Sequence, residues 1–272
     1  MGSQITKTAP ITQLLRRTDI PSRTRRRRRV VGWLLVTVSL GLGACHPPET
    51  PVRLAIEMRS TQAEDALLRF YLSELAMIDA EGRTVPVRLD ANAWQSDSTA
   101  LVALGGNTEN PVVSGKVANG RYEAIEFLLG VPFERNHGNP LAAAAPLNVP
   151  SMFWSWQSGY KFVRLDVGND WSFHLGSTGC VSASAVRPPD EPCRQPNAAR
   201  IRLASDAPEG GTIVVDLDAL LAHIDTAVEG NCMAAYAERE ACRSLLANLG
   251  MDPDTGLCLD GCGTQAVFRF AP

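Results

Sequence analysis

Alternating apolar and polar residues predict short β-strands along much of this chain. Apolar residues occupy every second position in 52–58, 85–89 and 265–270, which is the pattern of a strand with one buried face. The runs 69–79 and 122–130 are apolar at most positions and are followed by glycine-containing turns, so we interpret them as strands as well.

Other segments extend this pattern. Pro86 predicts an edge strand, because proline cannot donate a hydrogen bond to a ladder. The run 63–78, which overlaps a predicted strand, would also fit a helix. Residues 158–166 and 171–175 are expected to be two strands joined by the turn Val167-Gly168-Asn169-Asp170. We expect two further strands at 200–203 and 212–217.

Little of the chain favours helix. Apolar residues recur at helical spacing in 234–249, a segment that stops at Gly250. We expect one or two helical turns at 218–223, and a short helix or coil at 141–149. Many short strands with few short helices favour a mainly β fold, an antiparallel β-sandwich.

Residues 1–45 form an export signal that is not part of this fold. The basic run 25–29 precedes the apolar run 30–44, which is the layout of a signal peptide. A permanent membrane-spanning helix needs about 20 apolar residues, and this run is shorter. An uncleaved anchor helix is the alternative interpretation.

The end of the apolar run resembles a bacterial lipobox. Its residues Leu42-Gly43-Ala44-Cys45 predict cleavage before Cys45 and a lipid on the Cys45 sulfur. His46 stands where an aspartate would favour the inner membrane, so we expect a lipid anchor in the outer membrane. The protein would then lie in the periplasm or at the cell surface.

Removal of the signal leaves an acidic protein. Residues 1–45 hold nine of the 26 Lys and Arg and one of the 29 Asp and Glu, so the rest has a net charge of −11. Such a charge argues against nucleic-acid binding and is compatible with a metal cation or a basic partner. Residues 46–51 form a short tether, and 52–272 suit one domain.

The mature chain contains an even number of cysteines beyond Cys45, which in an exported protein indicates disulfides. Chain order favours three local pairs, although six cysteines allow 15 connectivities. A bridge that closes a loop of about 14 residues stabilises by roughly 3 kcal/mol. The last pair would bind Cu(I) if it were reduced. The expected pairs are Cys180–Cys193, Cys232–Cys242 and Cys258–Cys262.

Histidine and tryptophan concentrate between Asn136 and Cys180. This stretch holds two of the four histidines, His137 and His174, and the tryptophans Trp154, Trp156 and Trp171. Imidazole is a good ligand for copper and other late transition metals. Two histidines around an aromatic cluster therefore indicate a candidate metal site.

The strand pattern leaves this site open. In a continuous strand Trp154 and Trp156 share a face with Tyr160, and in the next strand His174 shares a face with Gly176. The register that would bring these faces together is not fixed by the sequence. Packing of the tryptophans in the core is the simpler interpretation of these residues.

Several blocks of the chain resemble the MbnP family, also called the metallo-mystery-pair four-Cys-motif proteins, over roughly 52–270. The tryptophan and histidine blocks are the longest and most specific. The matching residues are Phe70-Tyr71-Leu72-Ser73, Asn136-His137-x-x-Pro140, Leu147-Asn148-x-Pro150, Met152-Phe153-Trp154-x-Trp156-x-x-Gly159-Tyr160-Lys161-Phe162, His174-Leu175-Gly176-Ser177-Thr178-Gly179-Cys180, Asp252-Pro253-x-Thr255-Gly256 and Gln265-Ala266-Val267-Phe268-Arg269.

The resemblance implies a mostly β, copper-binding protein whose partner is a di-haem peroxidase of the MbnH/MauG-like type. That partner is expected to oxidise one tryptophan to kynurenine, which then helps to bind copper. His137 and His174 are the implied ligands, and Trp156, or alternatively Trp154, is the implied site of modification. The four family cysteines would be Cys180, Cys193, Cys232 and Cys242, so Cys258 and Cys262 are an addition to the family pattern.

Two other classes of function remain as alternatives to a non-enzymatic copper protein. A surface sandwich lipoprotein would bind a carbohydrate or protein through exposed Trp154 and Trp156, with no histidine near them. A hydrolase would need a nucleophile, yet the chain has no Gly-x-Ser-x-Gly elbow, and Ser158 and Ser177 have no base nearby in the sequence.

Overall fold

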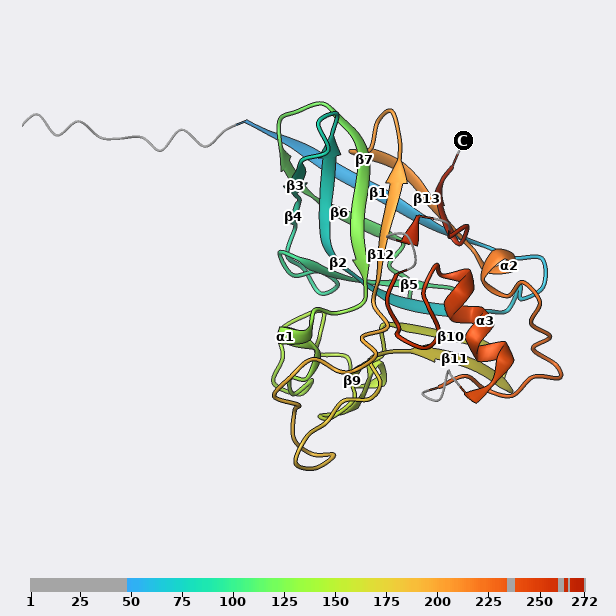
Figure 1. Cartoon of the computed structure of the whole chain (residues 1–272). Coiled ribbons are helices and arrows are strands. Elements are labelled where there is room, and N and C mark those ends of the chain that lie inside the picture. The colour runs from blue at the N-terminus through green and yellow to red at the C-terminus, as the bar shows by residue number, and fades with distance from the viewer. Residues whose placement is uncertain (1–47, 234–237, 259–261, 264, 272) are drawn as a thin grey trace, which may run out of the picture. The chain divides into compact units, whose positions relative to one another are not determined.

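The computed structural model describes residues 48–233, 238–258, 262–263 and 265–271 (Figure 1). The expected signal peptide 1–45 and the lipid site Cys45 lie outside this range, as do the first two residues of the tether. Within the described residues, no helix combines the length and the apolar composition needed to cross a membrane.

Two β-sheets enclose the main core. The first has five strands in the order β14-β13-β1-β6-β4. Its β1 and β13 run parallel, whereas its other neighbours are antiparallel, so the predicted antiparallel sandwich includes one parallel pair of strands. The strands are β1 (Glu49–Arg59), β4 (Arg88–Leu89), β6 (Val112–Ala118), β13 (Gly210–Asp216) and β14 (Phe268–Phe270).

The second sheet has seven antiparallel strands and is built around the long strand β2. The order β11-β10-β2-β7-β12 forms its main path, and β3 and β5 also pair with β2. Its strands are β2 (Leu67–Asp79), β3 (Thr84–Pro86), β5 (Thr99–Leu104), β7 (Tyr122–Leu129), β10 (Val163–Val167), β11 (Trp171–Leu175) and β12 (Ala199–Ala204).

The main core fills the space between these sheets. Alternate residues of β1, such as Leu54 and Ile56, meet Phe70 and Phe127 from the second sheet in one buried cluster. Helix α3 (Glu240–Asn248) adds Leu245 and Leu246 to this cluster, and the short helix α2 (Leu217–Leu220) packs beside it. The mainly β sandwich with few short helices is therefore confirmed.

A long excursion from 130 to 162 packs on the opposite, outer face of the second sheet. It contains α1 (Phe133–Asn136), the 3-10 turn η1 (Pro150–Met152) and the small ladder of β8 (Phe153–Ser155) with β9 (Gly159–Tyr160). A second buried cluster joins Tyr71 and Leu101 of the sheet to Met152, Tyr160 and Phe162 of the excursion. Strand β2 is apolar at most positions, which fits its burial on both faces.

Several element boundaries differ from the sequence expectations. The strand interpretation is confirmed for most of residues 63–78 and the alternative helix is not, and of the short helix or coil expected at 141–149 the structure has coil and turns. The predicted strand 158–166 is two strands, because the strand conformation is interrupted between Tyr160 and Val163. Segment 85–89 splits into strands of two different sheets, each with a single strand partner, so the edge position of Pro86 is confirmed.

The C-terminal elements are shorter than expected. Helix α3 begins at Glu240, not at Ala234, and residues 234–237 are outside the described range. Strand β14 covers only the end of the predicted strand 265–270. Strands β5 and β6 were not predicted: β5 is buried on both faces and has no alternation, and β6 contains a glycine and a lysine.

Three disulfides connect the six cysteines that the structure describes, in the local order that the sequence favours. The pairs are Cys180–Cys193, Cys232–Cys242 and Cys258–Cys262. The additional pair near the C-terminus is therefore a disulfide and not a dithiol site for a soft metal.

Candidate metal centre

His174 lies on the outer face of the second sheet, the face on which the excursion packs. Its neighbours Phe173 and Leu175 belong to the main core, and side chains alternate along a strand. The strand register places His174 opposite Arg164, and Arg164 opposite Arg69. A polar row therefore crosses β11, β10 and β2 on this face.

Asp166 fixes the imidazole of His174. The carboxylate Oδ1 lies 3.1 Å from His174 Nε2, so Nε2 carries the proton and Nδ1 carries the lone pair. Ser172 Oγ and Arg164 Nε also donate to Asp166. Burial alone would raise the pKa of Asp166, but these three donors outweigh it and lower the pKa.

Burial of the imidazole keeps His174 neutral. Desolvation lowers the pKa of His174, and the positive charges of Lys161 and Arg164 act in the same direction. The Asp166 carboxylate opposes them without reversing the shift. A neutral imidazole held by a carboxylate is the form in which histidine binds metals.

His137 is held in the opposite tautomer at the end of α1. Its Nδ1 lies 3.1 Å from the backbone oxygen of Trp156. Since a carbonyl oxygen only accepts, Nδ1 carries the proton and Nε2 carries the lone pair. Burial lowers the pKa of His137 more than this hydrogen bond raises it, so the ring is neutral at neutral pH.

The neighbouring residue Asn136 connects the excursion to the sheet. The residue is only 1% exposed. Its Oδ1 accepts from the Tyr160 amide at 2.8 Å, and its Nδ2 lies 3.3 Å from both Ser177 Oγ and His137 Nε2. Gly159 leaves room for this amide: a β-carbon there would lie within 2.6 Å of Asn136 Cγ. The His137 ring is thus fixed from both sides.

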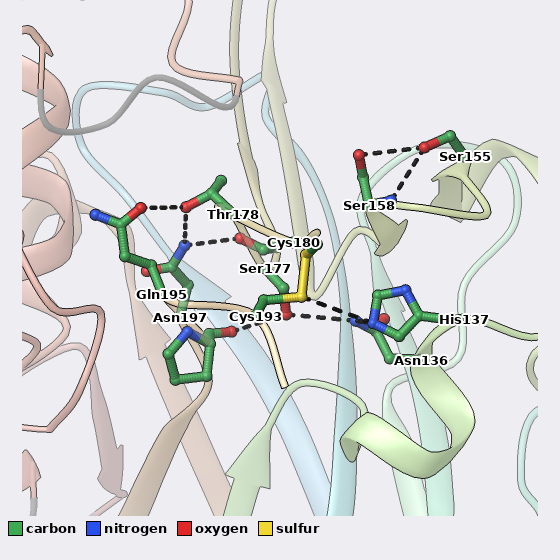
Figure 2. Close-up of a disulfide and its surroundings, with 12 residues drawn as sticks. Asn136, His137, Ser155, Ser158, Ser177, Thr178, Cys180, Cys193, Gln195 and Asn197 are labelled. Atoms are coloured by element: carbon green, nitrogen blue, oxygen red, sulfur yellow. Dashed lines mark hydrogen bonds between the residues drawn. A yellow bond between two sulfur atoms is a disulfide. The ribbon is translucent and has the colours of Figure 1, made fainter. Parts of the chain in front are cut away.

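The lone-pair side of His137 faces the Cys180–Cys193 disulfide (Figure 2). His137 Nε2 lies 3.8 Å from Cys193 Sγ. Within the described residues, these three form the group of metal-binding side chains whose ligand atoms lie within 4.8 Å of one another. Because the two sulfurs are bonded to each other, the imidazole is the ligand that this group offers in the oxidised protein.

The two histidines lie on the same side of the sheet but in separate polar clusters. His174 is grouped with Asp166, whereas His137 is grouped with Asn136 and the disulfide. Ser177, three residues after His174 in the chain, accepts a hydrogen bond from the Asn136 side chain. The end of the histidine block therefore connects the two clusters.

The two candidate tryptophans have different positions. Both are half-buried and outside the main core, unlike Trp171, which belongs to it. The ring of Trp154 lies against Gly176, where a β-carbon would approach Trp154 Cζ3 to 2.6 Å. Trp156 follows the end of β8 and offers its carbonyl to His137.

These contacts correct the expected strand through the tryptophans. Strand β8 ends at Ser155, where the Ser155 hydroxyl accepts from the Ser158 amide and closes a turn. Trp154 and Trp156 therefore do not share a strand face. The Trp154 ring packs on Gly176, two residues after His174 in the chain.

Sequence reasoning missed Asn136 and Asp166 as residues of this site. Asn136 directly precedes His137 in a matched block, which was an available signal. Asp166 reaches His174 only because the hairpin pairs Asp166 with Ser172. A scattered carboxylate gives no such signal in the sequence.

The comparisons with known proteins decide the family. The model of the MbnP family matches residues 49–234. This chain belongs to the MbnP family. A search of curated proteins found no match.

The MbnP fold is also present in a solved structure. MbnP from Methylosinus trichosporium superposes with a TM-score of 0.69 at 22% identity, over 82% of this chain and 99% of that one. At this identity the likeness shows a shared fold. Together, the MbnP family membership and the group around His137 suggest a metal-associated function.

Proposed function

We propose that this chain is an exported, non-enzymatic copper-binding lipoprotein. The observation that carries the proposal is the pair of oriented imidazoles: His137 and His174 each donate one ring proton to a fixed oxygen and keep a lone pair on the other nitrogen. This is the arrangement of histidines that bind metal. Two neutral nitrogen ligands suit copper.

The third ligand in this proposal is a tryptophan oxidised to kynurenine by a di-haem peroxidase. Hydrogen peroxide supplies two oxygen atoms as two equivalents are reduced to water, and the indole C2–C3 bond breaks. Hydrolysis of the resulting formamide releases formate and leaves an aryl amine. Both candidate tryptophans are half-buried, which leaves them within reach of a partner that docks on this surface.

Contacts within the chain favour Trp154 over Trp156 as the modified residue. The Trp154 ring is held against Gly176, two residues after His174 in the chain. Trp156 acts through its backbone, because its carbonyl orients His137. Copper bound here would be held by His137 and His174, with the new amine as an additional donor.

Intact-mass measurement and peptide mapping test the modification. Protein produced together with the peroxidase should gain the mass of one tryptophan-to-kynurenine conversion, and Trp154→Phe should abolish that gain. Trp156→Phe should preserve it. An unchanged mass in the co-produced wild type would contradict the proposed oxidation, and a gain lost only in Trp156→Phe would reverse the assignment.

Copper titration tests the histidines separately. His137→Ala combined with His174→Ala should weaken copper binding strongly, whereas the exposed His223→Ala should leave it unchanged. Equal copper affinity of the double variant and the wild type would exclude both ligands. The cellular location and the lipid on Cys45 are tested by membrane fractionation of wild type and Cys45→Ala.

A carbohydrate-binding role is the second candidate. A cleft of about 370 Å³ is lined by Trp154 together with polar residues such as Gln157, Ser158 and Thr178, which is a surface that fits sugars. This candidate predicted no histidine near the tryptophans, yet His137 bonds to Trp156. Glycan binding that is insensitive to copper and lost in Trp154→Ala would favour it.

A further inference from the structure

A second cleft opens on the outer face of the seven-stranded sheet, next to the polar row that contains His174. Its volume is about 230 Å³, and Arg69, Arg164 and Asp166 line it from the strands. The turn after β5 contributes Asn107 and Thr108, and the excursion contributes Ser151. The cleft thus combines charged side chains with hydrogen-bonding ones.

The two arginines face each other across neighbouring strands. Arg69 of β2 and Arg164 of β10 are direct partners in an antiparallel ladder, so their side chains project from the same face. Like charges in this position repel each other and destabilise the sheet. Asp166 relieves part of the repulsion through a 2.7 Å contact with Arg164 Nε.

Arg69 has no such compensation. It is half-buried and makes no hydrogen bond or ion pair with any residue that the structure describes. The terminal nitrogens of Arg164 likewise make no hydrogen bond within the described part of the chain, since its bond to Asp166 uses Nε. Guanidinium donors are therefore left over in a concave, partly desolvated place.

A third cation lies at the edge of the cleft. Lys161 Nζ donates to the backbone oxygen of Ser151, a lining residue. Burial lowers the pKa of Lys161, and the neighbouring Arg164 lowers it further. Three cations against one carboxylate give this cleft a local positive charge in a protein whose mature part is strongly acidic.

We propose that this cleft binds a small oxyanion of the phosphate or carboxylate class. The two guanidinium groups would hold its oxygens, because their planar forks match both groups geometrically. The hydroxyls of Thr108 and Ser151 and the amide of Asn107 are the neutral donors available beside them. The cleft borders the proposed copper site, because Asp166 lines the cleft and also contacts His174, but neither histidine is among the groups that would hold the anion.

The test uses the purified, metal-free protein titrated with inorganic phosphate and, separately, with malonate. Saturable binding of either anion should raise the melting temperature, and Arg69→Gln should weaken it about tenfold or more. Arg69→Lys should weaken it less. The control Arg202→Gln, an exposed strand arginine outside the cleft, should bind like the wild type.

Stability without the anion provides a second, independent readout. In anion-free buffer Arg69→Gln should melt at or above the wild-type temperature, because the arginine repulsion is removed. Absence of saturable binding of both anions at millimolar concentration would overturn the proposal. Equal anion affinity of Arg69→Gln and the wild type would overturn it as well.

Discussion

At the residue scale, two hydrogen bonds decide what the histidines are able to do. Asp166 holds the proton of His174 on Nε2, and the Trp156 carbonyl holds that of His137 on Nδ1. Each bond fixes both a ring orientation and the nitrogen that keeps its lone pair. The residues that accept these protons therefore matter as much as the histidines themselves.

Replacement of Asp166 tests this role. Asp166→Asn should weaken copper binding about 10- to 100-fold, because loss of such a partner disturbs the orientation of the ligand. Nitrogen NMR of the metal-free protein should show a loss of the single His174 tautomer. The exposed control Asp206→Asn should change neither. An unaltered tautomer with unaltered affinity would contradict the assignment.

The same histidines predict how stability depends on pH. Burial lowers the pKa of both His137 and His174 below the ordinary 6.5. The unfolded chain therefore takes up protons first as the pH falls, so the metal-free protein loses stability progressively below about pH 6.5 and is unaffected above it.

Denaturant unfolding between pH 5 and pH 8 measures this effect. His137→Asn and His174→Asn should each flatten the acid side of the profile, whatever their effect at pH 8. An identical slope in both variants and the wild type would contradict the prediction.

At the scale of the elements, a ladder and an excursion build the site together. Strand β11 presents His174 outward because Phe173 and Leu175 are drawn into the core. The excursion brings Asn136, His137 and the tryptophans onto that face through its cluster with Tyr71 and Leu101. Directly after β11, Gly176 contacts the excursion through the Trp154 ring.

Gly176→Ala tests this contact. The added β-carbon would lie 2.6 Å from Trp154 Cζ3 and 2.7 Å from the Tyr160 oxygen, so the Trp154 ring must move. We expect a loss of about 1–3 kcal/mol in stability and a shift of tryptophan fluorescence. Gly210→Ala is the matched control, because its nearest neighbour lies 3.9 Å away; similar effects of both changes would contradict this packing.

At the scale of the whole molecule, local disulfides hold segments that the sheets do not. Cys180–Cys193 closes a loop with a sequence separation of 13 beside His137, and Cys258–Cys262 closes one with a separation of 4. In the chain-entropy model the longer loop contributes more stability. The first bridge also packs against the imidazole.

Paired serine substitutions separate these two roles. Cys180→Ser with Cys193→Ser should cost about 3 kcal/mol of unfolding free energy, against about 2 kcal/mol for Cys258→Ser with Cys262→Ser. Only the first pair should also weaken copper binding, because it removes the contact of His137 with Cys193. Equal copper affinity of both pairs would show that this disulfide does not support the site.

The sequence by itself determined the sandwich class, most of the strands and the three local disulfides. Alternating apolar and polar residues indicate a strand with one buried face, and cysteines that are close in the chain favour local pairs. It missed β5, because residues buried on both faces do not alternate, and β6, which contains a glycine and a lysine. It also missed the break between the two strands that replace 158–166. It also named both histidines and both tryptophans as one set.

Only the tertiary structure decided how that set is arranged. A shift of one residue in strand register would move every side chain to the other face of the sheet. The actual register placed His174 on the outer face, opposite Arg164 and within reach of Asp166. The turn at Ser155 separated Trp154 from Trp156. The pairing of Arg69 with Arg164 across the ladder is likewise absent from any local pattern, since it joins residues far apart in the chain.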